Sequence, residues 1–187
     1  HLYQPTIGII SGIAWDHINV FPTFDNYVKQ FEIFAKMIPS DGQFIYCQDD
    51  TELMKLSEKV DQTTKVPYGV HPYHIRDGIT YLDTPYGEFP LQIFGKHNLT
   101  NLNAARFACR AVGIEDEAFY KAMTSFKGAS KRLELVAKNE QCSVYKDFAH
   151  SPSKLKATIS AVREQFPNRH LVACMELHTF SSLTEQF

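Results

Sequence analysis

The sequence predicts an α/β fold in which helices connect parallel strands. The first observation is the order of the segments, because strand-like and helix-like patterns alternate over the first 60 residues. The second is the nearly continuous apolar run from Pro5 to Ile13, which is typical of a parallel strand buried on both faces. The third is the composition: 44% hydrophobic, 21% charged and 13% aromatic residues exclude a disordered tail, a coiled coil and a collagen-like repeat.

The first half of the chain is expected to contain two strands and two helices in alternation. The expected order is strand, helix, strand, helix, over residues 5–13, 25–37, 43–47 and 49–59. Asp25 or Thr23 is suited to cap the first of these helices, and Pro39 ends it.

Residues 65–94 are expected to form a small antiparallel meander, because prolines and glycines interrupt short apolar runs there. Asp77-Gly78 is a signal for a hairpin turn within it. Helical spacing returns at 95–112 and ends at Gly113, a residue suited to a helix C-cap, and a further helix is expected at 116–125.

A new unit is expected to begin after a linker at 126–130. Its expected elements are two strands, a helix and a further strand, over residues 133–138, 143–145, 153–166 and 171–175. The apolar face of that helix is expected to carry Leu155, Ile159 and Val162. The sequence therefore predicts two domains, residues 1–129 and residues 130–187.

Charge and cysteine content narrow the class of protein. The chain has 19 basic and 21 acidic residues and a formal net charge of −2, which argues against a broad nucleic-acid surface but not against a phosphate pocket. The four cysteines show no C-x-x-C spacing, so we expect reduced thiols. No signal-peptide pattern and no apolar run long enough for a bilayer occur, so we expect a cytoplasmic protein without membrane partners.

The strongest candidate site is the segment 146–152, where a strand is expected to end and a helix to begin. Ligands in open α/β sheets bind outside the carboxyl ends of strands. Asp147 can accept hydrogen bonds from sugar hydroxyls or bind a cation there, and His150 can contact a phosphate or a carboxylate. The structural alternative is that Asp147 caps a turn and His150 is a solvated loop residue.

Four other polar segments allow both a functional and a structural interpretation. Asp16-His17 can bind a metal or phosphate, or form a polar turn. Segment 95–101 places amides and free N–H groups at a helix start, where they can read a base edge or bind an anion, or simply cap the helix. Lys131-Arg132 can contact phosphate or lie on a solvated face, and His178 follows the last expected strand in a polar loop.

Taken in order, these segments resemble the motifs of the Mur ligase family. Its members are ATP-dependent enzymes that add amino acids or peptides to UDP-N-acetylmuramate in peptidoglycan synthesis. Residues 12–17 look like the family's Asp-His loop, and residues 95–105 look like its G-x-H-N-x-x-N…A-A helix. Residues 126–134 resemble the F-x-G-x-x-R-R-x-E linker, and residues 147–152 resemble the D-[YF]-[AG]-H-H-P loop. The resemblance covers nearly the whole chain, from His1 to about Ser182.

The resemblance implies a domain assignment. Residues 1–129 would be the rear part of a P-loop-type central ATPase domain, and residues 130–187 the first part of a Rossmann-like C-terminal domain. The chain contains neither G-x-x-x-x-G-K-[ST] nor G-x-G-x-x-G, and it does not begin with Met. We therefore expect a fragment that lacks the family's P-loop segment and UDP-binding domain and is inactive alone.

The resemblance also implies that the cofactors are ATP and Mg²⁺, and it assigns residues to each of them. His17 would ligate the Mg²⁺ near the γ-phosphate. The adenine would be held by His97, Asn98 and Asn101. Arg132 and Asp147 would contact ATP from the C-terminal domain, with Asp147 at the ribose.

The same resemblance implies where the reacting groups meet. Phe148, His150 and His178 would line the place where the carboxylate of UDP-N-acetylmuramate meets the incoming amine. The expected catalytic residues are His150, Asp147 and His17. The chemistry would be formation of an acyl phosphate and then of an amide.

Two branches of the family fit the chain, and they differ in the amine that they use. Residues 1–5, 15–17 and 148–149 are similar to the murein peptide ligase branch, which attaches L-Ala-γ-D-Glu-meso-diaminopimelate. The tail 176–182 is closer to the branch that attaches L-alanine, although Ser182 stands where that pattern has Arg. We expect the peptide branch, with the L-alanine branch as the alternative. A folate-polyglutamate-type ligase and a non-catalytic nucleotide-binding α/β module are further alternatives.

Overall fold

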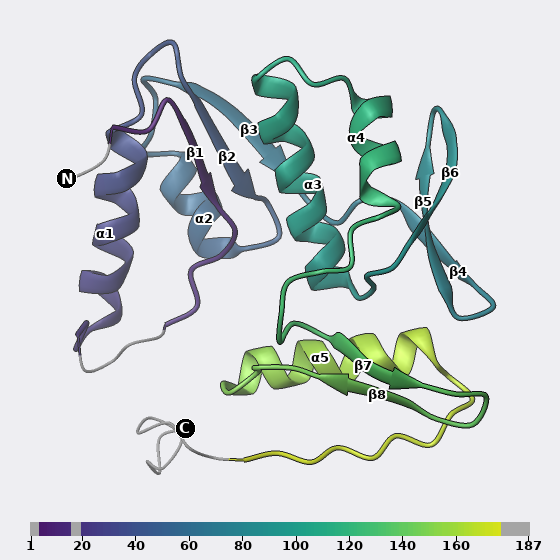
Figure 1. Cartoon of the computed structure of the whole chain (residues 1–187). Helices are drawn as coiled ribbons and strands as arrows, with labels where there is room; N and C mark the ends of the chain where they lie inside the picture. Colours follow the sequence, from purple (N-terminus) through teal and green to yellow (C-terminus); the bar gives the residue numbers. More distant parts are fainter. Residues whose placement is uncertain (1–3, 16–19, 177–187) are drawn as a thin grey trace. The chain divides into compact units, whose positions relative to one another are not determined.

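The computed structural model describes residues 4–15 and 20–176 (Figure 1). The chain divides into two compact units, one of residues 1–71 and 100–119 and the other of residues 72–99 and 120–187. These units are groups of residues that pack together, and they do not follow the predicted boundary at residues 129/130. That boundary is one of family domains and stays a prediction.

The first unit is built on a parallel sheet of three strands, which confirms the predicted fold class. The strands lie in the order β1 (Ile7–Ile10), β2 (Gln43–Cys47) and β3 (Thr64–Tyr68). Gln43 of the central strand lies opposite both Ile7 and Thr64. Four of the five residues of β2 are buried, as expected for a strand with a neighbour on each side and helices packed against it.

Helices α1 (Phe24–Lys36) and α2 (Thr51–Ser57) connect these strands. Thr23, one of the two expected caps, starts α1, and its hydroxyl accepts a hydrogen bond from the Asn26 backbone N–H at 3.3 Å. Asp50 caps α2 with one carboxylate oxygen, and the other oxygen accepts the Ile13 N–H at 2.7 Å. The cap of α2 therefore also fixes the segment that follows β1.

The position of β3 corrects the prediction that residues from 65 onward belong to the meander. Thr64–Tyr68 pairs in parallel with β2 instead. The physical reason is that α2, just before it, returns the chain to the starting end of the sheet, and such a crossover produces a parallel strand.

Helix α3 (Lys96–Ala111) contributes its C-terminal half to the core of the first unit through Ala104, Phe107 and Ala108. Gly113 follows it at φ +84°, the left-handed conformation expected of a C-cap. Asp116 begins α4 (Asp116–Met123) and forms ion pairs with Arg106 and Arg110 of α3.

The second unit contains the predicted meander, with strands β4 (Tyr73–Arg76), β5 (Ile79–Thr84) and β6 (Gly87–Leu91) in antiparallel order. Asp77 and Gly78 have φ values of +53° and +72°, as a two-residue hairpin turn requires, which confirms the predicted turn.

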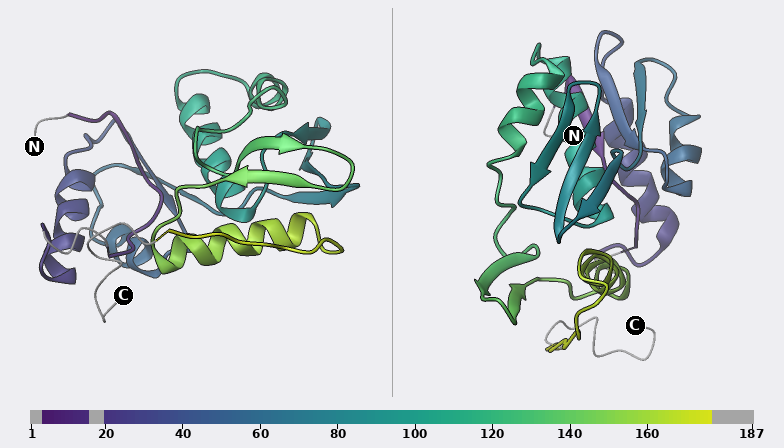
Figure 2. Two further views of the ribbon diagram at one scale, coloured as in Figure 1. Left: turned by 60° about the horizontal axis from the view of Figure 1, so that its bottom comes forward. Right: turned by 90° about the vertical axis from the view of Figure 1, so that its right-hand side faces the viewer.

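A hairpin and a helix complete the second unit. The hairpin consists of β7 (Glu134–Lys138) and β8 (Ser143–Lys146), and α5 (Pro152–Gln165) lies along it (Figure 2). The Phe94 ring lies 5.3 Å from that of Tyr145 and 5.9 Å from that of Phe166, measured between centroids. These rings pack with the buried Leu133 and Ala161 in a small core.

A buried amide attaches α5 to the meander. Gln165 is only 4% exposed, and its Nε2 donates to the Gly78 carbonyl at 2.7 Å while its Oε1 accepts from the Thr80 hydroxyl at 2.8 Å. Because both of these buried groups are hydrogen-bonded, the contact avoids the cost of an unsatisfied polar group.

Two expectations about the last part of the chain are wrong. Ile159, expected on the buried face of α5, is 40% exposed, because the face that packs carries Ala161 and Gln165 instead. Residues 171–176 form no strand, although one was expected at 171–175. No described strand pairs with this segment, so its backbone groups lack the ladder that defines a strand.

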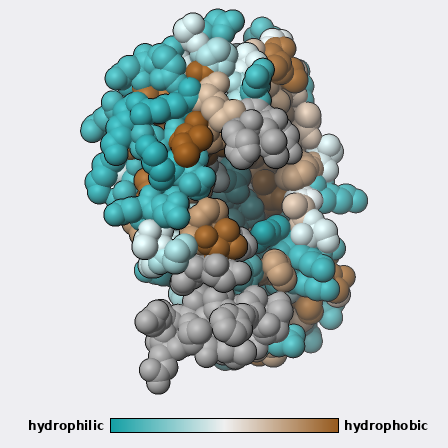
Figure 3. All heavy atoms as spheres, turned by 90° about the vertical axis from the view of Figure 1, so that its left-hand side faces the viewer, coloured by the Kyte–Doolittle hydropathy of each residue, from teal (hydrophilic) through white to brown (hydrophobic). Residues whose placement is uncertain are grey.

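Three features bear on the class of protein: the hydropathy of the surface, the composition of the helices and the state of the cysteines. Hydrophilic side chains dominate the face shown in Figure 3, and the hydrophobic ones there form separate small spots. Among the helices of residues 4–15 and 20–176, none has both the length and the apolar composition that crossing a membrane requires. All four cysteines are free thiols, and only Cys47 among them is buried.

Candidate functional site

The candidate site lies in the second unit, where α3 begins. Gly95 precedes the helix at φ +89°, and a Cβ atom there would lie 2.5 Å from the Cβ of Ala161 in α5. Glycine therefore permits both the turn and the close approach of α5. Asn98 donates its side-chain Nδ2 to the Phe94 carbonyl at 2.9 Å, so its amide steadies the turn before the helix.

The pKa of His97 is influenced by burial and by two other predicted nucleotide-binding residues. Burial lowers the pKa of His97 below the ordinary value of 6.5. The Asp147 carboxylate raises this pKa and the Arg132 guanidinium lowers it, so both charges act on the imidazole. At neutral pH His97 is therefore an uncharged ring that can donate and accept a hydrogen bond.

The loop after β8 is organised by Asp147. One oxygen of its carboxylate accepts the Ala149 N–H at 2.6 Å, and the other accepts the Leu133 N–H at 2.8 Å. These two bonds confirm that Asp147 caps a turn. Each carboxylate oxygen has a second lone pair, so Asp147 can still accept from a ligand hydroxyl.

His150 and Phe148 form a pair in the same loop. Nδ1 of His150 lies 2.9 Å from the Phe148 carbonyl oxygen, and the two rings lie 4.9 Å apart between centroids. Because a carbonyl only accepts, Nδ1 carries the proton in this contact, which leaves Nε2 for another partner. Phe148 is 43% exposed, so its ring offers an apolar surface to a ligand.

The turn before β7 is held by acidic side chains. Lys131 and Leu133, on either side of Arg132, have φ values of +58° and +47°. This left-handed conformation costs about 1–2 kcal/mol for a residue with a Cβ atom. The Glu134 carboxylate accepts the Lys131 N–H at 2.7 Å and the Ser130 hydroxyl at 3.1 Å, and Asp147 accepts the Leu133 N–H.

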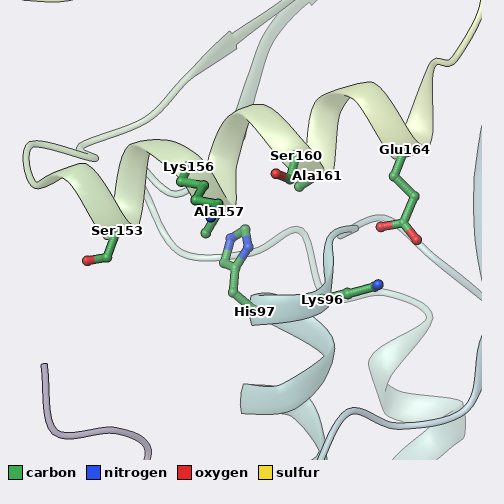
Figure 4. Close-up of a pocket in the computed structure, with 8 residues that line it drawn as sticks. All are labelled: Lys96, His97, Ser153, Lys156, Ala157, Ser160, Ala161 and Glu164. Carbon is green, nitrogen blue, oxygen red and sulfur yellow. The ribbon is translucent and has the colours of Figure 1, made fainter. Parts of the chain in front are cut away.

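A pocket of about 320 Å³ opens between the start of α3 and α5 (Figure 4). Eight residues line it: Lys96, His97, Ser153, Lys156, Ala157, Ser160, Ala161 and Glu164. The His97 ring points from α3 toward α5 in this view. The volume is at the lower end of the range for small-molecule sites, and the two ammonium groups suit an anionic or polar ligand.

Sequence reasoning missed the contribution of α5 to this pocket. The α5 residues that line it recur at steps of three and one, which is the spacing of one helix face. That pattern of small and polar residues was visible in the sequence. The Tyr73 hydroxyl donates to the Glu164 carboxylate at 2.6 Å, and burial, together with this bond, raises the pKa of Tyr73.

The remaining predicted residues divide into two groups. Asn101 lies on α3, one turn after Asn98, and is exposed. His17, the predicted Mg²⁺ ligand, and His178, the predicted acceptor-site residue, lie outside the described residues, and so does Asp16.

A separate cluster on the meander also has metal-ligand chemistry. His74, Asp83 and Glu88 place one ligand atom each within 4.8 Å of one another. His74 Nδ1 lies 2.7 Å from Asp83 Oδ1, and the Arg76 guanidinium pairs with Glu88 at 3.0 Å. Arg76 thus supplies a cation to Glu88, and the His74 ring is a hydrogen-bond partner of Asp83, so the arrangement is explained without a metal.

Comparison with known proteins identifies relatives of the sequence. A family model described as the Mur ligase middle domain matches residues 1–109, more than half of the chain. The UDP-N-acetylmuramate–L-alanine ligase of Bdellovibrio bacteriovorus is 30% identical over 97% of this chain, and that of Caldanaerobacter subterraneus is 28% identical over 96%. The chain spans 43% and 42% of the length of these two relatives.

Solved structures share the fold. MurF from Acinetobacter baumannii has a TM-score of 0.70 at 21% identity, over 84% of this chain and 37% of its own. The UDP-N-acetylmuramate-alanine ligase MurC from Thermotoga maritima has a TM-score of 0.67 at 20% identity, over 89% of this chain and 40% of its own. A murein peptide ligase from Psychrobacter arcticus has a TM-score of 0.59 at 22% identity, over 89% and 36%.

Proposed function

Because the chain belongs to the Mur ligase family, we propose that it forms part of an ATP-dependent ligase that joins UDP-N-acetylmuramate to L-alanine. The observation that carries the proposal is the hydrogen bond from the Leu133 N–H to the Asp147 carboxylate at 2.8 Å. It joins the turn that holds Arg132 to the loop that holds Asp147, and the resemblance to the family independently assigns both residues to ATP. The bacterial setting and the ATP and Mg²⁺ requirement are part of the same proposal.

The choice of L-alanine rests on the relatives. Eight curated relatives, each matched over at least 95% of this chain, are all L-alanine ligases by name. They favour the alternative over the peptide branch that we expected from the motifs. The peptide amine remains the second candidate, because Phe148-Ala149 in the site loop is similar to that branch.

The proposed reaction has two steps. A carboxylate oxygen of UDP-N-acetylmuramate attacks the γ-phosphorus of ATP, the bond from that phosphorus to the bridging oxygen breaks, and an acyl phosphate and ADP result. The amine of L-alanine then attacks the acyl carbon. The tetrahedral intermediate expels phosphate as the amine loses its proton, which leaves an amide.

Each part of the nucleotide would be bound by a side chain whose charge suits it. A neutral His97 suits a hydrogen bond to an adenine edge better than a contact with phosphate, whereas Arg132 is always cationic and suits a phosphate. The remaining lone pairs of Asp147 suit the ribose hydroxyls. Mg²⁺, when bound, would offset charge on the phosphoryl group that is transferred, and the resemblance assigns its ligand to His17.

The amine would be received by the Phe148–His150 pair. The Phe148 carbonyl fixes the ring orientation of His150 through Nδ1. Nε2 is then available to take the proton that the amine loses as it attacks. The exposed Phe148 ring would exclude water from that side of the acyl phosphate.

A phosphate-release assay tests this proposal. The longer protein that contains this chain is given ATP, Mg²⁺ and UDP-N-acetylmuramate with either L-alanine or the tripeptide. We expect L-alanine to drive phosphate release, and His150→Gln to slow it by a factor of about 10²–10⁴, as for the loss of a general base. Release driven by the tripeptide alone would transfer the proposal to the peptide branch. If neither L-alanine nor the tripeptide drives phosphate release, the result would favour the non-catalytic binding module.

The 187-residue chain by itself is proposed to be inactive. It contains no G-x-x-x-x-G-K-[ST] segment to cradle the β- and γ-phosphates. In the same assay we expect no phosphate release from it above that of the buffer. Measurable ligation by the chain alone would contradict this expectation.

A further inference from the structure

The turn at residues 130–133 is held from three directions by hydrogen bonds. The Lys131 N–H donates to Glu134 Oε2 at 2.7 Å, and the Lys131 carbonyl accepts the Phe148 N–H at 2.8 Å. The Leu133 N–H donates to Asp147 Oδ2 at 2.8 Å. Arg132 itself donates its N–H to the Ala129 carbonyl at 3.1 Å. The backbone on both sides of Arg132 is therefore fixed.

The turn adopts a conformation that its residues do not prefer. Lys131 and Leu133 both carry side chains and both have positive φ values, +58° and +47°. Such residues persist only where their surroundings enforce the conformation, and they gather at functional sites. Here the enforcing groups are two carboxylates, one of them in the candidate site.

Glu134 is the enforcing group without an assigned function. Its partly exposed carboxylate accepts both the Lys131 N–H and the Ser130 hydroxyl, and these bonds lower its pKa. It therefore stays ionised at neutral pH and acts as a strong acceptor on the turn.

We propose that Glu134 is a positioning residue for ATP: with Asp147 it clamps the turn at residues 130–133, and this clamp sets the place of the Arg132 guanidinium. The inference rests on the proposed function, because it concerns the residue expected to contact the phosphates. It adds a role for a residue that does not itself touch the nucleotide.

The test is a double-mutant cycle in the longer protein, with ATP KM as its measure. Glu134→Ala is expected to raise the KM for ATP about tenfold, as for the loss of a charge-assisted hydrogen bond, and to leave the KM for UDP-N-acetylmuramate unchanged. Glu134→Gln keeps an acceptor and is expected to have a smaller effect. In an Arg132→Ala background, Glu134→Ala is expected to have no further effect, because a positioning residue acts through its target.

Controls separate this role from a general loss of structure. Glu140→Ala, at an exposed glutamate in the β7–β8 turn, is expected to leave the KM for ATP unchanged. Ser130→Ala removes one donor from the clamp and is expected to raise that KM less than Glu134→Ala does. The Lys131 amide proton resonance reports the clamp directly and is expected to move upfield in Glu134→Ala.

The outcomes distinguish the inference from the function that it rests on. If the wild-type protein is active but the effects of Glu134→Ala and Arg132→Ala multiply, Glu134 acts independently and the inference is overturned. An unchanged ATP KM in Glu134→Ala also overturns it. If the wild-type protein uses no ATP, the proposed function fails, and the positioning role fails with it even if the Lys131 resonance moves.

Discussion

Replacing Gly95 by alanine tests whether the start of α3 depends on the close approach of α5. The added methyl would lie 2.5 Å from the Cβ of Ala161, well inside contact distance. Alanine at a left-handed position costs about 1–2 kcal/mol, and forcing a methyl into a packed contact costs about 1–3 kcal/mol more. We therefore expect Gly95→Ala to lower the free energy of unfolding by about 2–5 kcal/mol.

Gly113 provides the matched control for this prediction. It has φ +84°, close to the +89° of Gly95, but a Cβ atom there would meet nothing within 4 Å. Gly113→Ala should therefore show only the conformational cost of about 1–2 kcal/mol. The change that alanine makes to the unfolded chain is common to both variants and cancels in their difference.

Urea unfolding followed by circular dichroism measures both variants, and a second substitution tests the cause. Ala161→Gly removes the methyl that Gly95→Ala would strike, so the double variant should be about 1–3 kcal/mol more stable than the sum of the two single effects. Equal destabilisation by Gly95→Ala and Gly113→Ala would refute the reasoning. So would strict additivity with Ala161→Gly.

Three further predictions concern buried or partly buried polar groups. Thr80→Val should lower the free energy of unfolding by about 1–3 kcal/mol in urea titrations, because Gln165 Oε1 loses its donor inside the protein; an unchanged midpoint would contradict this. Asp50→Ala should cost about 1–2 kcal/mol for the lost cap and speed hydrogen exchange at the Ile13 N–H, whereas Asp41→Ala, in an exposed turn, should do neither. The pKa of His97 should be below 6.5 when it is measured by NMR titration. Because the pKa is depressed in the folded protein, the contribution of His97 to stability is present above pH 6.5 and is lost as the pH falls through the folded pKa. A measured pKa at or above 6.5 would contradict the burial of His97.

The local elements could be read from the sequence because their signals are local. Thr23 caps its own helix, and Asp77-Gly78 makes its own turn, so neither depends on distant residues. The apolar run near the N-terminus predicted a strand, and β1 lies within it. The expected burial on both faces is wrong for the described residues, because Ile9 in β1 is 41% exposed. The sequence predicts the wrong sheet for β3 because the residue types of Thr64–Tyr68 do not determine which strand they pair with. The crossover through α2 determines that β3 pairs in parallel with β2.

The parts of the site that escaped prediction depend on long-range contacts. Gln165 accepts a hydrogen bond from Thr80, 85 residues away in the sequence, and the periodicity of the sequence does not predict such a pairing. Ile159 was expected in the core because apolar spacing identifies a face but not what covers it. The motifs placed His97, Arg132 and Asp147 in one function, whereas the clamp of Glu134 on Lys131 requires knowledge of the backbone conformation.

The most direct test of the central claim is a crystal structure of the longer protein with UDP-N-acetylmuramate, Mg²⁺ and a non-hydrolysable ATP analogue. We predict adenine against His97 and Asn98, the ribose hydroxyls on Asp147, and phosphate oxygens within hydrogen-bond distance of Arg132. A nucleotide bound in full occupancy without contact to any of these four residues would contradict it.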